Sequence, residues 1–467
     1  MRLVASVVVL TAAALLGPTA GQAQDYYSDI RPLMLDRCAG CHVESGVAWS
    51  MEDAERVYAR RRSVAEAILD RQMPPWLAAA GHQTYVDDLS LSREQVGLVR
   101  AWVEAGYPKG NPRPDPELPR TASAFTVDLS LDVLGPEAYL PDQDNTDDYR
   151  CFTVEWPIGE TKYLTGFRAV PGNRRVAHHV VVHAVAPGMA ARFRELPAAE
   201  DRAGYQCFGG AEPDRLFSET ARAAYETQYP DGLRELSRGN HWLAHWAPGM
   251  DGYAFPVGTG VRMEPGSLLV VQMHYYSAHA PGESDAGTRL DLQLAEDVER
   301  PAFHYPLTRG DWLGGRRNGS MVVPAGETAT YETSVRLGDL ASYVAQVTGV
   351  SSEQVEALEV HSANLHMHAY GHSGEITLTD DRGRKETLLS VPRWNLGWQR
   401  DFTFQTPKVF RRDDLEDIRL TVTCTYENPT DGPVYGGYGS DEEMCFNFSY
   451  IAVRKGSAAE QQGGRPQ

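Results

Sequence analysis

The sequence is poor in positive charge and in long apolar runs. Its 467 residues include 44 Lys and Arg against 63 Asp and Glu, which gives a formal net charge of −19. Proteins that neutralise nucleic-acid phosphates carry the opposite sign, so we expect no nucleic-acid partner. After the first residues, no apolar stretch approaches the roughly 20 residues that cross a bilayer. The sequence therefore predicts no membrane span.

The longest apolar run lies at the N-terminus and has the layout of an export signal. Residues 3–16 are mostly apolar, follow Arg2, and precede the small-residue segment Gly21-Gln22-Ala23. This order is typical of a secretory signal peptide, here residues 1–23, and a retained anchor is the alternative. We expect a periplasmic or secreted protein in an oxidising compartment, where disulfides persist.

Cysteine is scarce as well, and two of the six cysteines belong to a haem motif. Cys38, Cys41 and His42 stand in the order C-x-x-C-H. In this pattern the two thiols attach a haem c covalently and the histidine binds its iron. A thioredoxin-like pair or half of a zinc site would need a context that the neighbouring sequence lacks.

Residues 25–110 resemble a small class I cytochrome c. Met73 is the expected sixth iron ligand because two prolines stiffen the loop directly after it, and His82 is the competing ligand. Residues 92–106 carry apolar side chains at helical spacing and predict a closing helix. Residues 111–123 are rich in proline and predict a linker.

The other four cysteines predict two disulfides. Four cysteines allow three different pairings. We favour the pairing between neighbours in the sequence, which joins Cys151 to Cys207 and Cys424 to Cys445.

From about residue 124 the sequence changes to short β-branched and aromatic runs separated by Gly and Pro. These runs predict strands of β-sandwiches; they cover residues 162–170, 176–185, 267–276, 375–379 and 419–426. Residues 196–237 and 337–358 have helical patterns and predict insertions. The predicted fold is a small all-α cytochrome c domain followed by two all-β, jelly-roll-like sandwich domains, residues 124–297 and 298–455, with helical insertions. A disordered tail is expected over 456–467.

Histidine, in contrast, is gathered in a few places. His178 and His179 are adjacent in an apolar strand, where neighbouring side chains face opposite sides. Both can bind one metal ion only if the strand ends or bulges there, or if they use different ring nitrogens. His274, in a second strand, could supply a third nitrogen. Two buried, hydrogen-bonded histidines are the structural alternative.

A second group combines histidine with a thioether. His366 and His368 are two residues apart, so on a strand they share a face and can converge on one ion. Met444 is a soft ligand that suits Cu(I) and rarely binds zinc. The adjacent Cys445, as half of a disulfide, would hold the methionine in place.

These motifs resemble those of the copper type II, ascorbate-dependent monooxygenases, the family of peptidylglycine α-hydroxylating monooxygenase and dopamine β-monooxygenase. The similarity extends over about residues 149–453 and keeps the family's order: His178-His179, Trp246-Ala247-Pro248-Gly249, Gln272-Met273-His274-Tyr275, His366-Met367-His368 with Gly371, and Glu443-Met444-Cys445.

The resemblance implies two sandwich domains, each with one copper ion, facing each other across a solvent-filled cleft. His178, His179 and His274 would bind the electron-transfer copper. His366, His368 and Met444 would bind the catalytic copper, where O2 is activated and a substrate C–H bond is hydroxylated. A one-electron donor, either a redox protein or a small reductant, is the further partner. The haem motif predicts a relay from haem to the three-histidine copper and then to the second copper, although the reverse flow is also open.

The sequence departs from the peptide-hydroxylating members of this family at three positions. Asn364, Phe446 and Phe448 stand where those members hold a substrate carboxylate with Arg, Asn and Tyr. None of the three can offer a charged fork to a carboxylate. We therefore expect a small organic substrate of apolar or aromatic character, not peptidylglycine. That both phenylalanines are simply core residues is the alternative.

Two other classes of function keep the same ligands. A non-catalytic copper and haem protein of the cell envelope, for redox sensing or electron transfer, needs no substrate site. A zinc hydrolase could use His366 and His368 as metal ligands, although Met444 argues against it because zinc rarely takes a thioether ligand. The remaining histidines have less specific patterns; we expect cleft-lining or structural roles for His241 and His245, supporting or proton-handling roles for His361 and His372, and structural or surface roles for His183, His279 and His304.

Overall fold

The computed structural model describes most of the chain after residue 23. The described residues are 24–42, 49–86, 88–115, 125–135, 137–207, 210–213, 219–230, 233–246, 250, 252–278, 280–314, 319–437 and 441–456. The expected signal peptide and nearly all of the expected tail lie outside these residues. Within the described residues, no helix is long and apolar enough to cross a membrane.

The chain divides into two compact units. One comprises residues 1–74 and 90–118, and the other comprises residues 75–89 and 119–467. Residues 75–89 lie inside the range expected for the first domain, yet they group with the second unit.

The first unit is built from short helices. They are η1 (Tyr26–Ile30), α1 (Arg31–Arg37), α2 (Ala54–Ala59), α3 (Arg61–Leu69) and α4 (Arg93–Glu104). Helix α4 is the predicted closing helix, and Ser92 and Gln95 cap its first turn reciprocally. Its Val99 and Trp102 are fully buried in the core of this unit. These helices are few and short, and on their own they do not make a cytochrome c fold evident.

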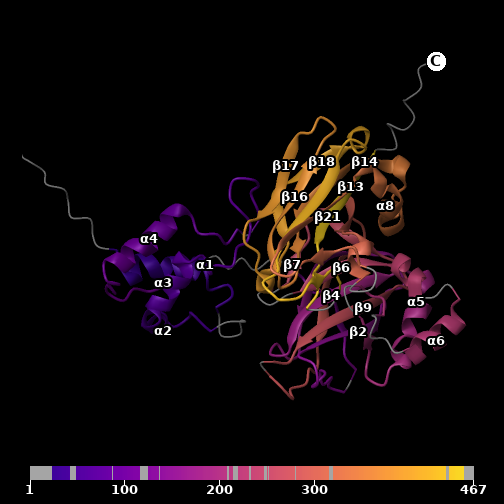
Figure 1. Ribbon diagram of the computed structural model, residues 1–467, viewed down its shortest axis with the longest axis horizontal. Coiled ribbons are helices and arrows are strands. Elements are labelled where there is room, and N and C mark those ends of the chain that lie inside the picture. The colour runs from indigo at the N-terminus through magenta and orange to yellow at the C-terminus, as the bar shows by residue number, and fades with distance from the viewer. Residues whose placement is uncertain are drawn as a thin grey trace, which may run out of the picture. The chain divides into compact units, whose positions relative to one another are not determined.

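The second unit consists mainly of sheets (Figure 1). A ten-stranded sheet contains, in spatial order, β1 (Leu129–Asp132), β10 (Arg289–Ala295), β3 (Lys162–Val170), β8 (Thr259–Met263), β11 (Arg300–Leu307), β21 (Phe446–Lys455), β14 (Val355–Ala363) and β18 (Phe402–Arg411), with β7 (Tyr253–Ala254) beside β3 and β15 (Leu365–His366) beside β21. A five-stranded sheet contains β5 (Tyr205–Gln206), β2 (Asp147–Glu155), β9 (Leu268–Tyr276), β4 (Ala177–Val185) and β6 (Asn240–Trp246). A four-stranded sheet contains β13 (Thr328–Arg336), β19 (Arg419–Glu427), β16 (Gly371–Thr379) and β17 (Lys385–Val391), and β12 (Val322–Val323) pairs with β20 (Val434–Tyr435).

Two large cores show that these sheets form β-sandwiches. One core joins the five-stranded sheet to the β1 to β8 part of the long sheet. The other joins the four-stranded sheet to the β11 to β18 part. The fold therefore confirms the predicted sandwiches.

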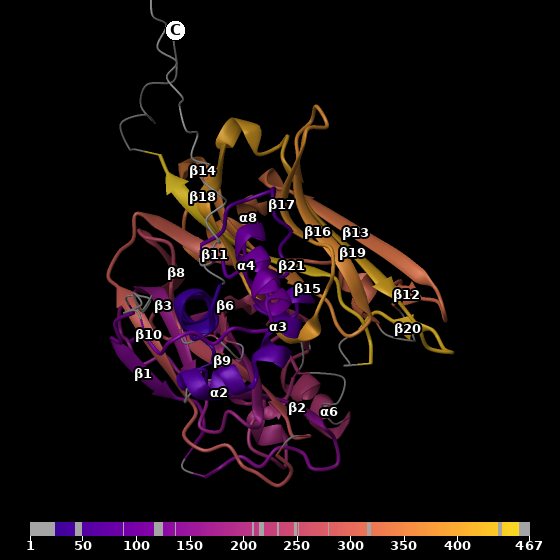
Figure 2. The ribbon, with the colours of Figure 1, turned by 90° about the vertical axis from the view of Figure 1, so that its left-hand side faces the viewer.

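One sheet runs through both sandwiches. Strand β11 pairs in parallel with β8 of the first sandwich and antiparallel with β21 of the second, and Figure 2 shows these strands in one curved layer. The expected boundary at 297/298 falls just before β11. The sequence pattern gives no sign of this continuity, because a pairing between strands about 40 residues apart leaves no local signature.

The predicted strands agree with the structure more closely than the predicted helices. Each of the five expected strands is present, and the one expected at 375–379 begins earlier, at Gly371. The expected helical stretch 196–237 contains α6 (Glu219–Gln228) and the 3-10 turns η2 (Pro197–Ala199) and η3 (Leu233–Gly239), after α5 (Pro187–Arg194). The prediction of a helix over residues 337–358 was wrong at its C-terminal end. Helix α8 (Ala341–Thr348) is ended by Gly349, which has a left-handed conformation, and strand β14 begins at Val355.

Short 3-10 turns complete the second unit. They are η4 (Gly310–Gly314), η5 (Gly338–Leu340), η6 (Ser352–Gln354), η7 (Leu396–Trp398) and η8 (Arg412–Asp414). Of these, η7 contributes Leu396 and Gly397 to the lining of the cavity described below.

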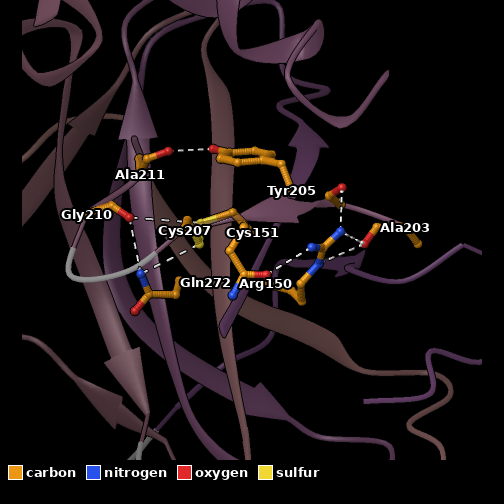
Figure 3. The surroundings of a disulfide bond; sticks show 10 residues. Arg150, Cys151, Ala203, Tyr205, Cys207, Gly210, Ala211 and Gln272 are labelled. Carbon is orange, nitrogen blue, oxygen red and sulfur yellow. Dashed lines mark hydrogen bonds between the residues drawn. A yellow bond between two sulfur atoms is a disulfide. The ribbon is translucent and has the colours of Figure 1, made fainter. Parts of the chain in front are cut away.

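Both predicted disulfides are present. Cys151 pairs with Cys207 and Cys424 pairs with Cys445, in each case with fully buried sulfur-bearing residues. Figure 3 shows the first pair, where Gln272 Nε2 donates to the carbonyl oxygen of Gly210 (3.1 Å) beside the disulfide. The disulfide links the loop after β5 to strand β2, and the hydrogen bond of Gln272 links the same loop to strand β9. Both β2 and β9 also carry residues of the site described below.

Candidate functional site

A β-bulge brings His178 and His179 to the same side of strand β4. The register between β4 and β9 shifts between Ala177 and His179, so His178 is the extra residue and His179 stands opposite His274. The condition that the sequence set for two adjacent metal ligands is therefore met. Nδ1 of His274 lies 3.1 Å from Nδ1 of His178 and 3.2 Å from Nδ1 of His179.

This spacing fits three ligands of one metal ion. Two nitrogens that each lie about 2.0–2.1 Å from an ion at a tetrahedral angle are roughly 3.3 Å apart. The three histidines form a group whose ligand atoms all lie within 4.8 Å of one another. We call His178, His179 and His274 the three-histidine set.

Asp147 and Tyr149 hold the ring of His274 from strand β2. The Nε2–H of His274 donates to Asp147 Oδ1 (2.7 Å), which leaves Nδ1 unprotonated and directed at the other two histidines. The phenol ring of Tyr149 stacks on the imidazole with centroids 4.0 Å apart and planes 8° from parallel. Burial lowers the pKa of His179 and His274 well below the usual value, so both rings stay neutral, the form that binds a metal.

The second group lies at the start of the second sandwich. His366 ends β15, His368 follows in the next turn, and Met367 between them points into the core with no exposed surface. The two imidazole rings are 5.2 Å apart. The alternation expected for residues i and i+2 therefore holds, although the regular strand ends at His366.

In this group the hydrogen-bonded ring nitrogen is Nδ1, whereas in His274 it is Nε2. Nδ1 of His366 donates to Gln399 Oε1, and Nδ1 of His368 donates to the carbonyl oxygen of Glu442 (2.8 Å). In these tautomers Nε2 of each ring carries no hydrogen, which is the form of imidazole that binds a metal ion. Burial lowers the pKa of His366 to about 3, with a smaller contribution from His368, so this ring too is neutral.

Met444 completes this group on a fixed backbone. Its side chain is 2% exposed, and its carbonyl oxygen accepts the Tyr426 hydroxyl (2.6 Å). The adjacent Cys445 is held by the disulfide to Cys424. We call His366, His368 and Met444 the thioether set.

Glu443 ties the two halves of the thioether set together. Its buried carboxylate accepts the backbone N–H groups of His368 (2.9 Å), Tyr370 (2.6 Å) and Met444 (3.3 Å). Burial raises the pKa of Glu443 to about 7, against the lowering effect of these hydrogen bonds. The carboxylate thereby fixes the loop of His368 against the loop of Met444.

Both sets line one cavity of about 410 Å³. The rings are close enough for His366 to lower the pKa of His179 and for His368 to lower that of His274. The resemblance implied two ions facing each other across a solvent-filled cleft. In this structure residues of both donor sets line the same partly open cavity.

An aromatic wall lies next to the thioether set. Phe446 and Phe448 stack in parallel with centroids 5.3 Å apart, and Trp242 lies 4.3 Å from Phe448. These rings form a small apolar cluster with Met444 and Leu313. Both phenylalanines line the cavity while being more than nine-tenths buried.

The third expected substrate contact, Asn364, has a polar side chain that already makes a hydrogen bond within the protein. Its amide donates to Asp401 Oδ1 (2.8 Å), and Asp401 also lies 3.6 Å from Nε2 of His245. Asn364 and His245 line the cavity. The expectation of a cleft-lining role is met for His245.

The remaining histidines lie elsewhere. His361 bonds to the buried Glu359 (3.2 Å), and His372 pairs with Glu427 (3.2 Å), so neither touches the cavity. His183, His241 and His304 are not among the cavity-lining residues, and each has a buried ring nitrogen without a hydrogen-bond partner. His279 lies outside the described residues.

The first unit presents the haem-motif residues in a form that fits a haem c. Neither Cys38 nor Cys41 is part of a disulfide, whereas the other four cysteines form two. Nδ1 of the buried His42 donates to the carbonyl oxygen of Trp49 (2.9 Å), which leaves Nε2 for an iron atom. Two thiols outside any disulfide, followed by an oriented histidine, are the groups that covalent haem attachment requires.

The sequence of the second sandwich matches a known family model. Residues 338–456 match the family model of the copper type II ascorbate-dependent monooxygenase, C-terminal domain. The match supports the copper type II monooxygenase family. The matched region contains the whole thioether set, and the three-histidine set lies outside it.

Other comparisons add little. No curated protein matches the chain. Among solved structures, a peptide-N(4)-(N-acetyl-β-D-glucosaminyl) asparagine amidase is 8% identical, covering 70% of this chain and 96% of that chain with a TM-score of 0.29. The major capsid protein P2 from bacteriophage PM2 is 9% identical, covering 71% and 98% with a TM-score of 0.24. Scores this low bear on neither the fold nor the function of this chain.

Several site residues had no signal in the sequence. Asp147 and Gln399 orient ligand histidines, yet neither belongs to a motif that the sequence showed; Glu443 was part of a motif, but its bonds to the loop of His368 were not foreseen. Tyr149 stacks on His274 from a different strand. Only the paired register of β2 and β9, which places Tyr149 opposite His274, could have revealed it.

Proposed function

We propose that this protein is a copper-dependent monooxygenase that hydroxylates a C–H bond of a small organic substrate with O2. The observation that carries the proposal is the shared cavity, which collects a three-nitrogen set, a two-nitrogen and thioether set, and an apolar wall. Bound copper would supply the one-electron steps and the activation of O2 at these sets. Hydroxylation consumes two electrons, and two one-electron sites in one cavity can supply both.

The residues around each set have defined tasks in this proposal. Asp147 fixes the tautomer of His274, and Gln399 and the Glu442 carbonyl fix the tautomers of His366 and His368. Met444 favours the reduced state of copper because a thioether is a soft ligand. His366, His368 and Met444 are the catalytic group, and the three-histidine set stores an electron.

The apolar wall supports a substrate without a carboxylate. Phe446, Phe448 and Trp242 line the cavity and belong to one apolar cluster with Met444, and Asn364 already donates to Asp401. None of these groups offers a cation to an anionic substrate. We propose a small apolar or aromatic molecule and exclude peptidylglycine.

A haem c in the first unit would be the electron donor. Cys38 and Cys41 would hold the porphyrin, and His42 and Met73 would bind the iron. Met73 belongs to the first unit, whereas His82 lies on the segment grouped with the second unit, near Glu375. This favours Met73 over His82. In the relay that the sequence predicts, the electron reaches the three-histidine set first.

The test is copper-dependent turnover. We expect the protein to bind two copper ions per chain and, once reduced, to consume O2 in step with product formation from a panel of small apolar substrates. Hippuryl-type carboxylates should not react. A protein that binds copper but consumes no O2 with any member of the panel would contradict the proposal and favour the non-catalytic alternative.

A further inference from the structure

The segment that follows Met73 is built into the second sandwich. Residues 75–89 group with the second unit, and their backbone bonds to two of its strands: Ala79 N–H donates to Ser390 O (2.8 Å) and Val86 N–H donates to Thr403 O (2.8 Å). The Tyr85 hydroxyl donates to Leu388 O (2.7 Å) inside the core. An ordinary connection between helices α3 and α4 would need none of these bonds.

Trp76 is the first aromatic residue of this segment. Its ring packs edge-on against Phe402 with centroids 5.0 Å apart. The guanidinium of Arg400 lies over the ring of Trp76, 5.1 Å from its centroid. Trp76 is therefore fixed between two residues of one short stretch of chain.

That stretch leads directly to the thioether set. Gln399, next to Arg400 in the chain, accepts the Nδ1–H of His366. Phe402 is paired with Ala363 across strands β18 and β14, three residues before His366. Two short connections thus run from the Trp76 ring to His366, one through Arg400 and Gln399 and one through Phe402 and β14.

We propose that Trp76 is the bridge by which electrons reach the thioether set directly, without first passing through the three-histidine set. The inference rests on the proposed function for the identity of both metals, and it adds a second route to the relay through the three-histidine set. In each transfer one electron leaves Fe(II), which becomes Fe(III), and reduces one Cu(II) to Cu(I). No proton has to move, because both imidazoles of the set keep their Nδ1 hydrogens.

The Arg400 cation defines how Trp76 acts. A positive charge over an indole face is attracted to the neutral ring and opposes the loss of an electron from it. Trp76 is therefore a connecting medium and is not itself oxidised. Trp76 therefore connects the two metal sites electronically and is not a catalytic residue.

The experiment follows the haem and the copper separately, without O2 and without substrate. The double variant His178→Ala/His179→Ala is loaded with copper to one ion per chain and mixed with one equivalent of a one-electron reductant. The haem absorption band reports its reduction and reoxidation, and freeze-quench EPR reports the loss of Cu(II). We expect haem reoxidation and Cu(II) loss in step, at a rate close to that of the unsubstituted protein.

Substitutions of Trp76 test the bridge in the same background. Trp76→Leu should slow haem reoxidation by an order of magnitude or more, and Trp76→Phe, which keeps a ring against Phe402, should restore most of the rate. Arg400→Gln leaves the ring in place and tests the branch through Gln399. Val86→Ala, on the same segment but with its side chain 42% exposed, is the control for segment packing. The melting temperature, haem spectrum and copper content show whether each variant is folded and loaded.

The outcomes separate the bridge from the proposed function. If the double variant loses haem reoxidation while His368→Ala retains it, electrons enter at the three-histidine set and the inference is wrong. An unchanged rate in Trp76→Leu, or a protein that carries no haem, overturns it as well. Each of these results leaves copper-dependent hydroxylation with an external reductant unaffected, and the absence of haem would refute only the proposed donor. Hydroxylation is therefore judged independently, by O2 consumption and product formation.

Discussion

The three-histidine set and the thioether set differ in how their ligands are held. In the first, all three ligands belong to regular strands of one sheet, a bulge supplies the convergence, and the metal-facing atom is Nδ1. In the second, the ligands sit where strands end, loops are tied together by Glu443, and the metal-facing atom of each histidine is Nε2. The difference suggests a division of labour. A rigid, all-nitrogen site suits storage of an electron, and a site of loops with a thioether suits chemistry on O2.

The largest expected effect comes from deleting one ligand in each set. His368→Ala should abolish product formation, and copper content should fall from two ions per chain to one. His179→Ala should also remove one copper, but a single turnover should remain possible when both electrons come from outside. Metal analysis with single-turnover product assays checks both variants. Equal residual single turnover in the two variants would show that the sets are interchangeable, contrary to the comparison.

Replacing the thioether should separate copper binding from O2 chemistry. Met444→Leu keeps the volume and the disulfide at Cys445 but removes the soft ligand. We expect the reduction potential of this copper to fall and product formation to drop by about 100-fold, a loss of roughly 3 kcal/mol in transition-state stabilisation. The three-histidine set should keep its EPR spectrum. A spectrum altered at that set instead would mean that Met444 serves both ions.

The groups behind the ligands should have smaller, set-specific effects. Asp147→Asn should weaken copper binding at the three-histidine set by about 10- to 100-fold, the usual cost of losing such a partner. Gln399→Leu should weaken the thioether set by a similar factor and leave the first set unchanged. Copper titration followed by EPR distinguishes the two. If either substitution weakened both sets equally, the separate support of the sets would be refuted.

The smallest effect concerns pH and buried histidines outside the sets. Burial lowers the pKa of His183 to about 3 and that of His304 to about 4. Because the unfolded chain binds protons that the folded protein does not, stability should fall as pH decreases from about 6.5 to 4. Each such histidine contributes up to about 1.4 kcal/mol per pH unit. Denaturant unfolding of the metal-free protein measures this slope.

Substitution identifies the histidines responsible for that slope. His183→Phe replaces a histidine in the five-stranded sheet that carries the three-histidine set. His304→Phe replaces one in the sheet shared by both sandwiches. Each should make the free energy of unfolding less dependent on pH, and His372→Gln, at an exposed ion pair, is the matched control. A slope unchanged in both phenylalanine variants would place the pH dependence elsewhere.

The local parts of this architecture could be predicted from the sequence. Adjacent His178 and His179 required a bulge, and the structure has one; His366 and His368 required a shared face, and their rings are 5.2 Å apart. The two disulfides followed from proximity in the chain. These predictions succeeded because strand alternation and short loops act over a few residues.

The parts that depend on distant pairing could not be predicted. The parallel contact between β8 and β11 makes one sheet of two expected domains, and it places both metal sets in one cavity. Asp147 reaches His274 only because β2 lies beside β9, 127 residues later in the chain. Likewise, residues 75–89 read as part of the haem domain, and only their bonds to β17 and β18 assign them to the second unit.

Isotopic labelling of the product tests the central claim most directly. Copper-loaded protein, reduced and supplied with an apolar substrate under ¹⁸O₂, should give a hydroxylated product in which the new oxygen is ¹⁸O, and His368→Ala should give none. A product whose oxygen comes from water, or a protein that is oxidised by O2 without changing the substrate, would contradict the account of a copper monooxygenase with its two metal sets in one cavity.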